Sequence, residues 1–326
     1  MSFKDDLTFS LSILGSRNQY SVPTDEIVSL DAEMTVFGFK AKVCFWCKAD
    51  YNGNDIFDEM VSLQQSEIRI SFESILKQPD DKPDPLMLRG PIISKTIEEM
   101  TFADVTDKSV LYRFFEVEFT DPASVYWKEH FPSEIHVSAT MSEVLDKHCP
   151  DGLNLTKLWL DLENPDDIIA IHLPPDNGAS FYDFIMWYTD THDGSLTYDN
   201  QSNTYYLLPL KPVGADSEKI PYTIVEKLKI IQPRIPRHEV SVLNSYTEES
   251  KKSSIEQSYS VSGIRHDHLI RTPLSSDFTS KESLEESRLR QPGNELLIEL
   301  KDFPWLPYSP GSAIETSQTD WPETVY

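Results

Sequence analysis

The sequence predicts an α+β, mainly β fold in which a small α+β domain is inserted into a β-rich chain. Alternation of apolar and polar side chains with a period of two is typical of strands; it dominates the chain before residue 120, and strand-like segments return after residue 209. Apolar residues at helical spacing gather in the stretch between these two blocks. A chain of 326 residues is also too long for one core of ordinary size, so several domains are expected.

We expect three domains, because the β-rich blocks on either side of the middle stretch could be two related barrels. The first β-barrel module covers 1–120, the inserted α+β domain covers 121–208, and the second β-barrel module covers 209–326. The second module carries an exposed excursion rich in Ser and Glu at about 245–290, where large apolar residues are few.

The first block reads as strands separated by turns. Thr8–Ile13 and Glu67–Phe72 alternate with period two, and Tyr112–Thr120 is a further strand candidate. Gln78–Pro85 holds three prolines and three aspartates, which predicts a loop, and Leu86–Gly90 resumes extended structure.

The middle stretch reads as two helices followed by a hairpin. Ser138–His148 begins with Ser and Thr, carries its acids early and its bases late, and so suits the helix dipole. In Ser180–Asp190, apolar residues fall at i, i+3, i+4 and i+7 behind a Ser that can cap the helix. Leu196–Tyr198 and Asn203–Leu208 then predict a hairpin, and Ile220–Ile231 is the first strand candidate of the second block.

Charge and composition exclude several function classes. The net charge of −25 repels phosphate backbones, so sequence-specific nucleic-acid binding is not expected. The N-terminus lacks the basic-then-apolar order of a secretion signal, and no apolar run is long enough for a membrane anchor. We therefore expect synthesis in the cytoplasm.

Short catalytic and cofactor motifs are missing from the sequence. It contains no G-x-S-x-G, H-E-x-x-H, Walker or G-x-G-x-x-G pattern, so we predict no enzyme activity and no cofactor. Cys44 and Cys47 form a C-x-x-C, but they lie in a strand-like segment that places the two thiols on opposite faces.

The histidines give no metal motif either. His266 and His268 would share one face of a strand without a third ligand nearby in sequence, and their Ser-rich setting favours an exposed loop. His130 and His136 flank an aromatic residue and a proline, which favours a structural role. No metal site is predicted.

Several landmarks follow one another in the middle of the chain: a strand, an aromatic segment, a short helix, a second helix and a hairpin, at Tyr112–Ala123, Tyr126–Pro132, Met141–Leu145, Ala179–Tyr188, Leu196–Asp199 and Asn203–Tyr206. Their order resembles the hub region of contractile-injection spike proteins. These are the tail-hub proteins of contractile-tailed phages and the N-terminal part of VgrG-type proteins of type VI secretion systems. The likeness covers about Leu7–Pro233.

The resemblance implies a structural, non-enzymatic baseplate hub of a phage tail or secretion apparatus. Two barrels per chain and three chains per hub, a homotrimer, would form a pseudo-sixfold ring. The implied partners are a hexameric tube protein, an OB-fold and needle-like spike protein, and other baseplate subunits. Members in secretion systems continue into the spike, whereas this chain stops after a family-like segment at Pro310–Gly311, so we expect a separate spike polypeptide or a shortened coding sequence.

The same resemblance suggests which residues shape and pack the inserted domain. The segment that enters this domain is expected to be shaped by Tyr126, Trp127, His130 and Pro132. Its second helix is expected to be packed by Phe181, Tyr182, Phe184 and Trp187, and we expect Trp187 to be buried.

The sequence is also compatible with two other functions. Another β-rich baseplate protein, or a carbohydrate-binding or adhesin module, predicts exposed aromatic platforms at Trp46, Trp127 or Trp305. A hydrolase that uses carboxylates is a third reading. The excess acids could line a channel and prevent adhesion there, or could lie on a solvated outer surface.

Overall fold

The structure is a computed structural model of the whole chain. The residues it describes are 7–15, 18–49, 56–62, 65–74, 86–103, 109–137, 139–163, 178–192, 194–209, 218–220, 225–231, 237–244, 249–255, 265–272, 295–300 and 314–316. Two compact units share the chain: Met1–Glu218 with Trp305–Glu315 belongs to the first, and Lys219–Pro304 with Thr316–Thr324 to the second. The predicted loop at Gln78–Pro85 lies outside the described residues.

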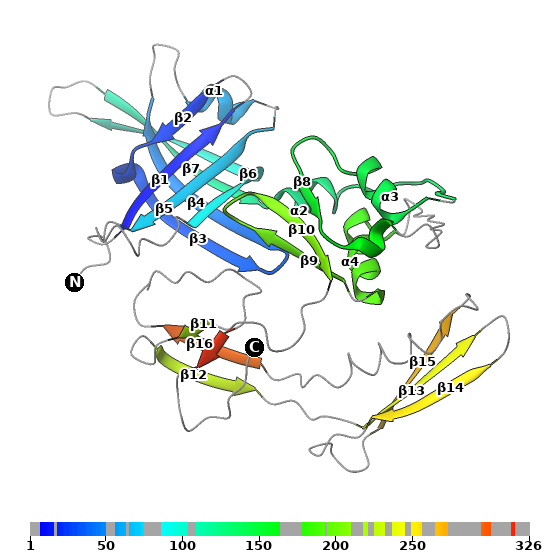
Figure 1. The fold of residues 1–326 in the computed structure, drawn as a ribbon. Coiled ribbons are helices and arrows are strands. Elements are labelled where there is room, and N and C mark those ends of the chain that lie inside the picture. The colour runs from blue at the N-terminus through cyan, green and yellow to red at the C-terminus, as the bar shows by residue number, and fades with distance from the viewer. Residues whose placement is uncertain are drawn as a thin grey trace. The chain divides into compact units, whose positions relative to one another are not determined.

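A seven-stranded antiparallel sheet forms the N-terminal part of the first unit (Figure 1). The strand order is β2-β1-β5-β6-β7-β4-β3. The strands are β1 (Leu7–Leu14), β2 (Gln19–Val22), β3 (Ile27–Thr35), β4 (Gly38–Lys48), β5 (Glu67–Ser74), β6 (Leu86–Ala103) and β7 (Ser109–Thr120). The short helices η2 (Thr24–Glu26) and α1 (Ile56–Val61) lie between β2 and β3 and between β4 and β5 in the chain. The strands predicted in this block are confirmed.

The 18-residue strand β6 joins the two halves of this sheet. Its first part, from Leu86 to Pro91, pairs with β5, and the part from Ile92 onward pairs with β7. The register shifts between Ile92 and Ser94, and such an irregularity bends a strand and increases its twist. One strand therefore serves two partners and curves the sheet.

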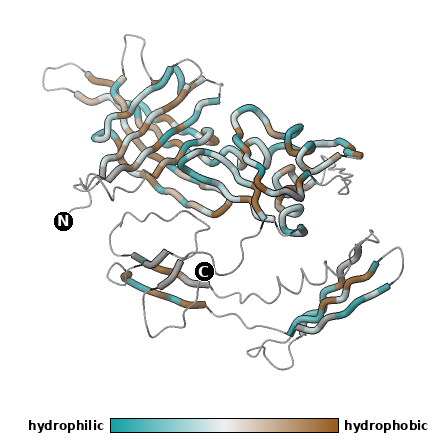
Figure 2. Tube along the Cα trace, viewed as in Figure 1, coloured by the Kyte–Doolittle hydropathy of each residue, from teal (hydrophilic) through white to brown (hydrophobic). Residues whose placement is uncertain are grey.

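The period-two pattern of the sequence places one face of the sheet in the core. Ten residues on this face are at most 1% exposed: Leu11, Ile13, Val43, Phe45, Ile68, Ile70, Leu88, Phe115, Val117 and Phe119. Apolar and polar positions alternate along these strands (Figure 2). Cross-strand ion pairs lie among the more exposed positions, as between Lys42 and Glu116 at 2.8 Å. The strand prediction for Cys44 and Cys47 is confirmed by β4, in which both thiols are free.

Helices and a small sheet follow one another in the middle of the chain, and we call these elements the α+β unit. Its elements are α2 (Pro122–Tyr126), α3 (Met141–Lys147), β8 (Asn154–Lys157), η3 (Leu160–Glu163), α4 (Phe181–Thr191), β9 (Gly194–Asp199) and β10 (Thr204–Pro209). In its three-stranded sheet, β10 runs parallel to β8 and antiparallel to β9. Thr140 and Ser180 begin α3 and α4 with complete capping boxes, so both helix predictions and the hairpin prediction are confirmed.

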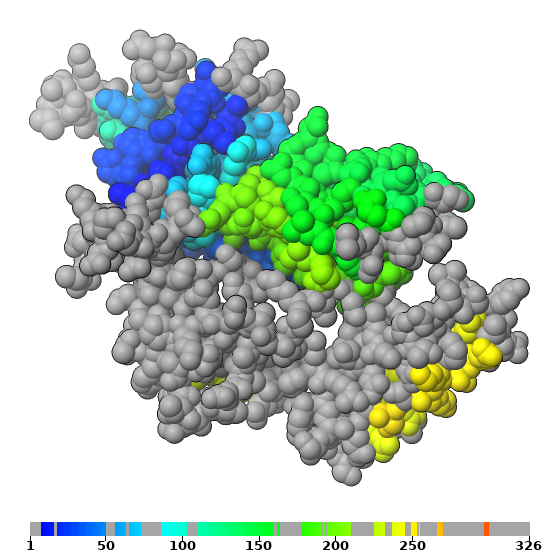
Figure 3. Space-filling model, viewed as in Figure 1, coloured from blue at the N-terminus to red at the C-terminus, as the bar shows by residue number. Residues whose placement is uncertain are grey.

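The seven-stranded sheet and the α+β unit share one apolar core. Phe119 of the sheet and Trp127, Phe181 and Tyr205 of the α+β unit all belong to the same buried cluster. The two parts form a continuous surface (Figure 3). Side chains at their junction are therefore held from both sides.

The second unit contains two small sheets. Strand β12 (Val225–Ile231) pairs antiparallel with β16 (Glu295–Leu300). Strand β13 (Arg237–Asn244) lies between β14 (Ser250–Ile255), which is antiparallel to it, and β15 (Arg265–Thr272), which is parallel. Two further short strands, β11 (Glu218–Ile220) and β17 (Ile314–Thr316), pair with each other, and each includes residues of both units.

The predicted polar excursion at 245–290 contains regular structure. Strands β14 and β15 lie inside it, and most of their described side chains are exposed, as expected. Strands with little buried surface carry no apolar alternation, so their composition resembled that of an irregular segment.

Among the described residues, no helix has the length and apolar character needed to cross a membrane.

Candidate functional site: an aromatic and histidine cluster

Asp121 fixes the turn from the seven-stranded sheet into the α+β unit. Its side chain is buried, with 3% of the residue exposed, and it caps α2 by accepting the Ser124 amide at 3.0 Å. The Tyr205 hydroxyl of β10 donates to the same carboxylate. Burial, and then the charge of Asp121, raise the pKa of Tyr205, which keeps this phenol protonated as a donor.

Trp127 and the start of α4 interlock through their backbones. The Phe181 amide donates to the His130 carbonyl at 2.8 Å, and the Tyr182 amide donates to the Trp127 carbonyl at 3.2 Å. These amides belong to the first turn of α4, whose N–H groups have no partner within the helix. The aromatic segment after α2 therefore completes the N-terminus of α4.

Ring packing reinforces this arrangement. Trp127 is fully buried, and its ring centroid lies 6.0 Å from that of Phe181 and 5.8 Å from that of Tyr205. Its indole N–H donates to the His148 carbonyl at 3.0 Å, at the end of α3. One tryptophan thus connects α2, α3, α4 and β10.

The other predicted residues surround this core at different depths. Pro132 and Phe184 are buried, whereas Tyr126 and Tyr182 are half-buried. Burial, followed by the charges of Asp121 and Asp183, raises the pKa of Tyr182 to about 12. The Lys128 ammonium lies 4.9 Å from the centre of the Tyr182 ring.

The expected burial of Trp187 is wrong. It is 57% exposed, although its ring centroid lies 5.9 Å from that of Phe184. The buried stripe of α4 consists of Phe181, Phe184, Ile185 and Tyr188. Trp187 stands six residues after Phe181, about 240° around the helix, and so projects from another face.

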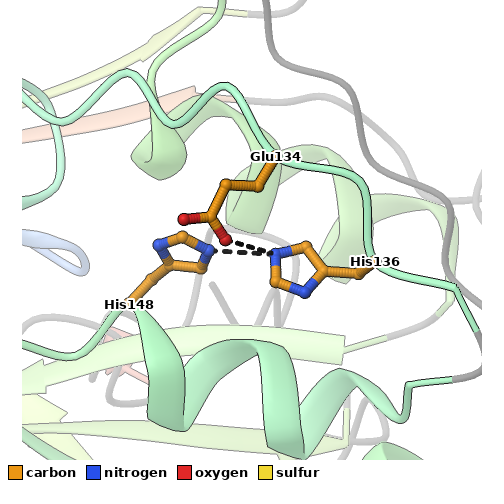
Figure 4. Close-up of side chains that lie close together, drawn as sticks. All are labelled: Glu134, His136 and His148. Atoms are coloured by element: carbon orange, nitrogen blue, oxygen red, sulfur yellow. Dashed lines mark hydrogen bonds and ion pairs between the residues drawn. The ribbon is translucent and has the colours of Figure 1, made fainter.

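Four polar side chains gather beside this aromatic core. His148 Nδ1 lies 2.9 Å from His130 Nε2, and His148 Nε2 lies 3.1 Å from His136 Nε2. Glu134 Oε2 lies 3.6 Å from His136 Nε2 and also accepts from the Lys147 ammonium. Figure 4 shows Glu134, His136 and His148 converging on one point. Sequence spacing gave no sign of this, because His148 reaches the group only where α3 ends against the preceding loop.

The electrostatics of this group favour a neutral imidazole at its centre. Burial lowers the pKa of His148 to about 4, and His130 adds to the effect as a like charge. The Lys147 ammonium lowers the pKa of Glu134, which keeps that carboxylate ionised. The cluster therefore holds one carboxylate and a chain of three imidazoles.

A second group of histidines lies on the three-stranded sheet of the second unit. His266 and His268 sit on β15, not on the loop that the sequence favoured. His238 of β13 supplies a third imidazole, with its Nδ1 at 2.9 Å from His268 Nε2. The sequence did not reveal it, because parallel pairing of β13 with β15 brings together residues about thirty positions apart.

A cleft of about 500 Å³ lies beside Asp121. Charged and polar side chains such as Glu33, Lys40 and Lys128 line it together with Tyr182. Its described lining offers neither histidine nor cysteine.

Comparisons with known proteins identify the fold. No protein-family model matches the sequence, and a search of curated proteins finds no match. Among solved structures, a chain of the half-lidded Francisella PdpA–VgrG complex matches 98% of this chain at 16% identity with a TM-score of 0.62. This chain spans about half, 52%, of the length of that one.

Two tail proteins match over most of both chains. The prophage MuSo2 43 kDa tail protein from Shewanella oneidensis matches 97% of this chain and 91% of its own, at 11% identity with a TM-score of 0.54. A tail protein from Neisseria meningitidis MC58 matches 98% and 88%, at 9% identity with a TM-score of 0.55. The fold is thus the one that these tail proteins and that complex share, and the resemblance drawn from the sequence landmarks is confirmed at the level of fold.

Proposed function

We propose that this chain is a structural baseplate hub of a contractile injection machine, from a phage tail or a type VI-like secretion system. The observation that carries the proposal is the fold match with two tail proteins, because it extends over at least 97% of this chain and 88% of theirs. A likeness that spans whole chains favours a shared architectural role over the chance reuse of one domain.

In this proposal each chain contributes two β-barrel modules, and three chains form a pseudo-sixfold ring. Six similar modules offer six quasi-equivalent surfaces to a hexameric tube protein, while the threefold axis suits a trimeric OB-fold and needle-like spike. Other baseplate subunits would bind the rim. The strongly curved seven-stranded sheet, with β6 shared between its halves, is the part of the structure that best suits the first module.

The junction residues have a structural role in this proposal. The buried contacts of Asp121, Trp127, Phe181 and Tyr205 hold the inserted unit at a fixed angle to the first sheet. A hub must keep its surfaces in register with two partners, so a rigid junction is what the role requires. The function then depends on surface shape, without a reactive side chain.

The adhesin or carbohydrate-binding alternative has weaker support. Of its three predicted platforms, Trp127 is fully buried and Trp46 is half-buried against Phe114, with ring centroids 4.9 Å apart. Trp305 lies outside the described residues.

The mass of the full chain in solution tests the proposal. Analytical ultracentrifugation at micromolar concentration should give a species of three chains, 3 × 37.4 kDa, or about 112 kDa. A chain that stays monomeric at this concentration would contradict it.

A further inference from the structure

We infer that Glu134, His136 and His148 form a binding site for a divalent transition-metal ion of the zinc class, and that His130 positions His148 in it. This site goes beyond the proposed hub function, and it would hold a metal whether the chain is a monomer or a trimer. The sequence motifs predicted none, because the ligands come from an irregular segment and the end of a helix.

The distances suit such an ion. One ligand atom from each of the three residues lies within 4.8 Å of the other two. The distance between His136 Nε2 and His148 Nε2 is 3.1 Å, and that between His136 Nε2 and Glu134 Oε2 is 3.6 Å. Zinc bonds of about 2.0 to 2.2 Å at tetrahedral angles separate ligand atoms by about 3.3 to 3.6 Å, so only small movements are required.

The donor set also suits this class of metal. Imidazole nitrogens select zinc, copper, iron or nickel over calcium and magnesium, which prefer oxygen ligands. Two histidines and one glutamate leave a fourth position for water, as in many zinc sites.

His130 supplies the supporting contact that such sites use. A neutral His148 can donate from Nδ1 to His130 Nε2, which leaves the lone pair of its Nε2 facing His136. Metal-binding histidines commonly donate their other ring N–H to a neighbour in this way, and the contact fixes both tautomer and orientation. The His148 ring also packs on Phe181, with centroids 4.6 Å apart, so the ligand is held in place before the ion arrives.

Among the described residues, Lys147 opposes metal binding. Its ammonium lies on Glu134 Oε2, the oxygen that would face the ion, and its side chain is 55% exposed. Removing this positive charge should strengthen metal binding, whereas removing a ligand should weaken it. Opposite effects from neighbouring positions distinguish a site from general surface adsorption.

Titration of the full chain with Zn²⁺, monitored by isothermal titration calorimetry, tests the inference. The wild type should bind one Zn²⁺ at this site. Glu134→Gln should lower the affinity for Zn²⁺ at least about tenfold, and His136→Asn at least about 100-fold. Loss of a residue that only supports a metal ligand already lowers metal affinity by about 10 to 100-fold, so loss of a ligand should have at least such an effect. Lys147→Gln should bind several-fold more tightly. His148→Ala is avoided because the ring belongs to the core, and circular dichroism checks that each variant is folded.

The double variant His266→Asn/His268→Asn is the matched control, since it removes the other histidine group and should keep wild-type affinity. Co²⁺ in place of Zn²⁺ should give a visible spectrum without a thiolate band, which excludes the cysteines as ligands. The inference is overturned if the wild type binds no Zn²⁺, if His136→Asn titrates like the wild type, or if only the double variant loses binding.

Discussion

The Tyr205 hydroxyl donates a hydrogen bond to the Asp121 carboxylate, and both side chains are buried. The two residues are 84 positions apart: Tyr205 lies near the start of β10, and Asp121 lies between β7 and α2. The same hydroxyl oxygen accepts the Ala123 amide at 3.2 Å. One phenol thus links β10 to the turn between β7 and α2.

Removing that hydroxyl should destabilise the first unit. Tyr205→Phe leaves a buried carboxylate without one donor and the Ala123 amide without its acceptor, so we expect a loss of about 1.5 to 3 kcal/mol in the free energy of unfolding. Urea denaturation followed by tryptophan fluorescence measures it. The control is Tyr206→Phe, at the half-buried neighbouring position, which should change stability little. If both variants changed the free energy of unfolding equally, the bond between the Tyr205 hydroxyl and Asp121 would not have this stabilising role.

Two tryptophans of the α+β unit should differ sharply in their effect on stability. Trp127→Ala removes a fully buried ring and should cost about 3 to 5 kcal/mol. Trp187→Ala removes a ring that is 57% exposed and should cost less than about 1 kcal/mol. Thermal unfolding of both variants measures the difference. A Trp187→Ala protein as unstable as Trp127→Ala would show that Trp187 is buried after all.

Stability should fall on mild acidification because of His148. Burial, His130, His136 and Lys147 lower its pKa to about 4, and the Glu134 charge opposes them in part. The unfolded chain takes up the proton at an ordinary pKa of about 6.5. The contribution is therefore complete above about pH 6.5 and is lost as the pH falls towards 4.

Urea midpoints measured across this window, with a chelator present, should decrease with pH in the wild type. The decrease should be smaller in His148→Gln, which does not titrate. If the two proteins lose stability in parallel, other groups carry the acid dependence.

Gly90 of β6 should not tolerate a side chain. A Cβ at this position would overlap the carbonyl oxygen of Thr120, and backbone atoms cannot move aside cheaply. We expect Gly90→Ala to lose about 1 to 3 kcal/mol or more, as overpacking does. Thr96→Ala, at an exposed position of the same strand, is the control for denaturation measurements. A fully stable Gly90→Ala protein would mean that β6 and the end of β7 are further apart.

Local patterns in the sequence predicted the elements of the first unit well. Ser180 at a helix start and the alternation of Glu67–Phe72 are signals that neighbouring residues carry by themselves. The exposure of Trp187 was also present in the helical spacing, because it lies off the stripe formed by Phe181, Phe184 and Tyr188. Counting 100° of rotation per residue around the helix would have predicted that Trp187 is exposed.

The rest of the site depends on contacts between distant residues. The Asp121–Tyr205 bond, the His148 cluster and the pairing of His238 with His268 all join residues separated by loops. Their spacing follows no motif, so only the folded chain brings them together. Strands β14 and β15 stayed hidden for a different reason, since exposed strands carry little apolar pattern.

The most direct test of the hub proposal is an electron cryo-microscopy structure of the purified assembly. We expect three chains around a channel, with six β-modules that superpose on one another and alternate around the ring. A ring of six chains, or a chain in which only one such module exists, would contradict it.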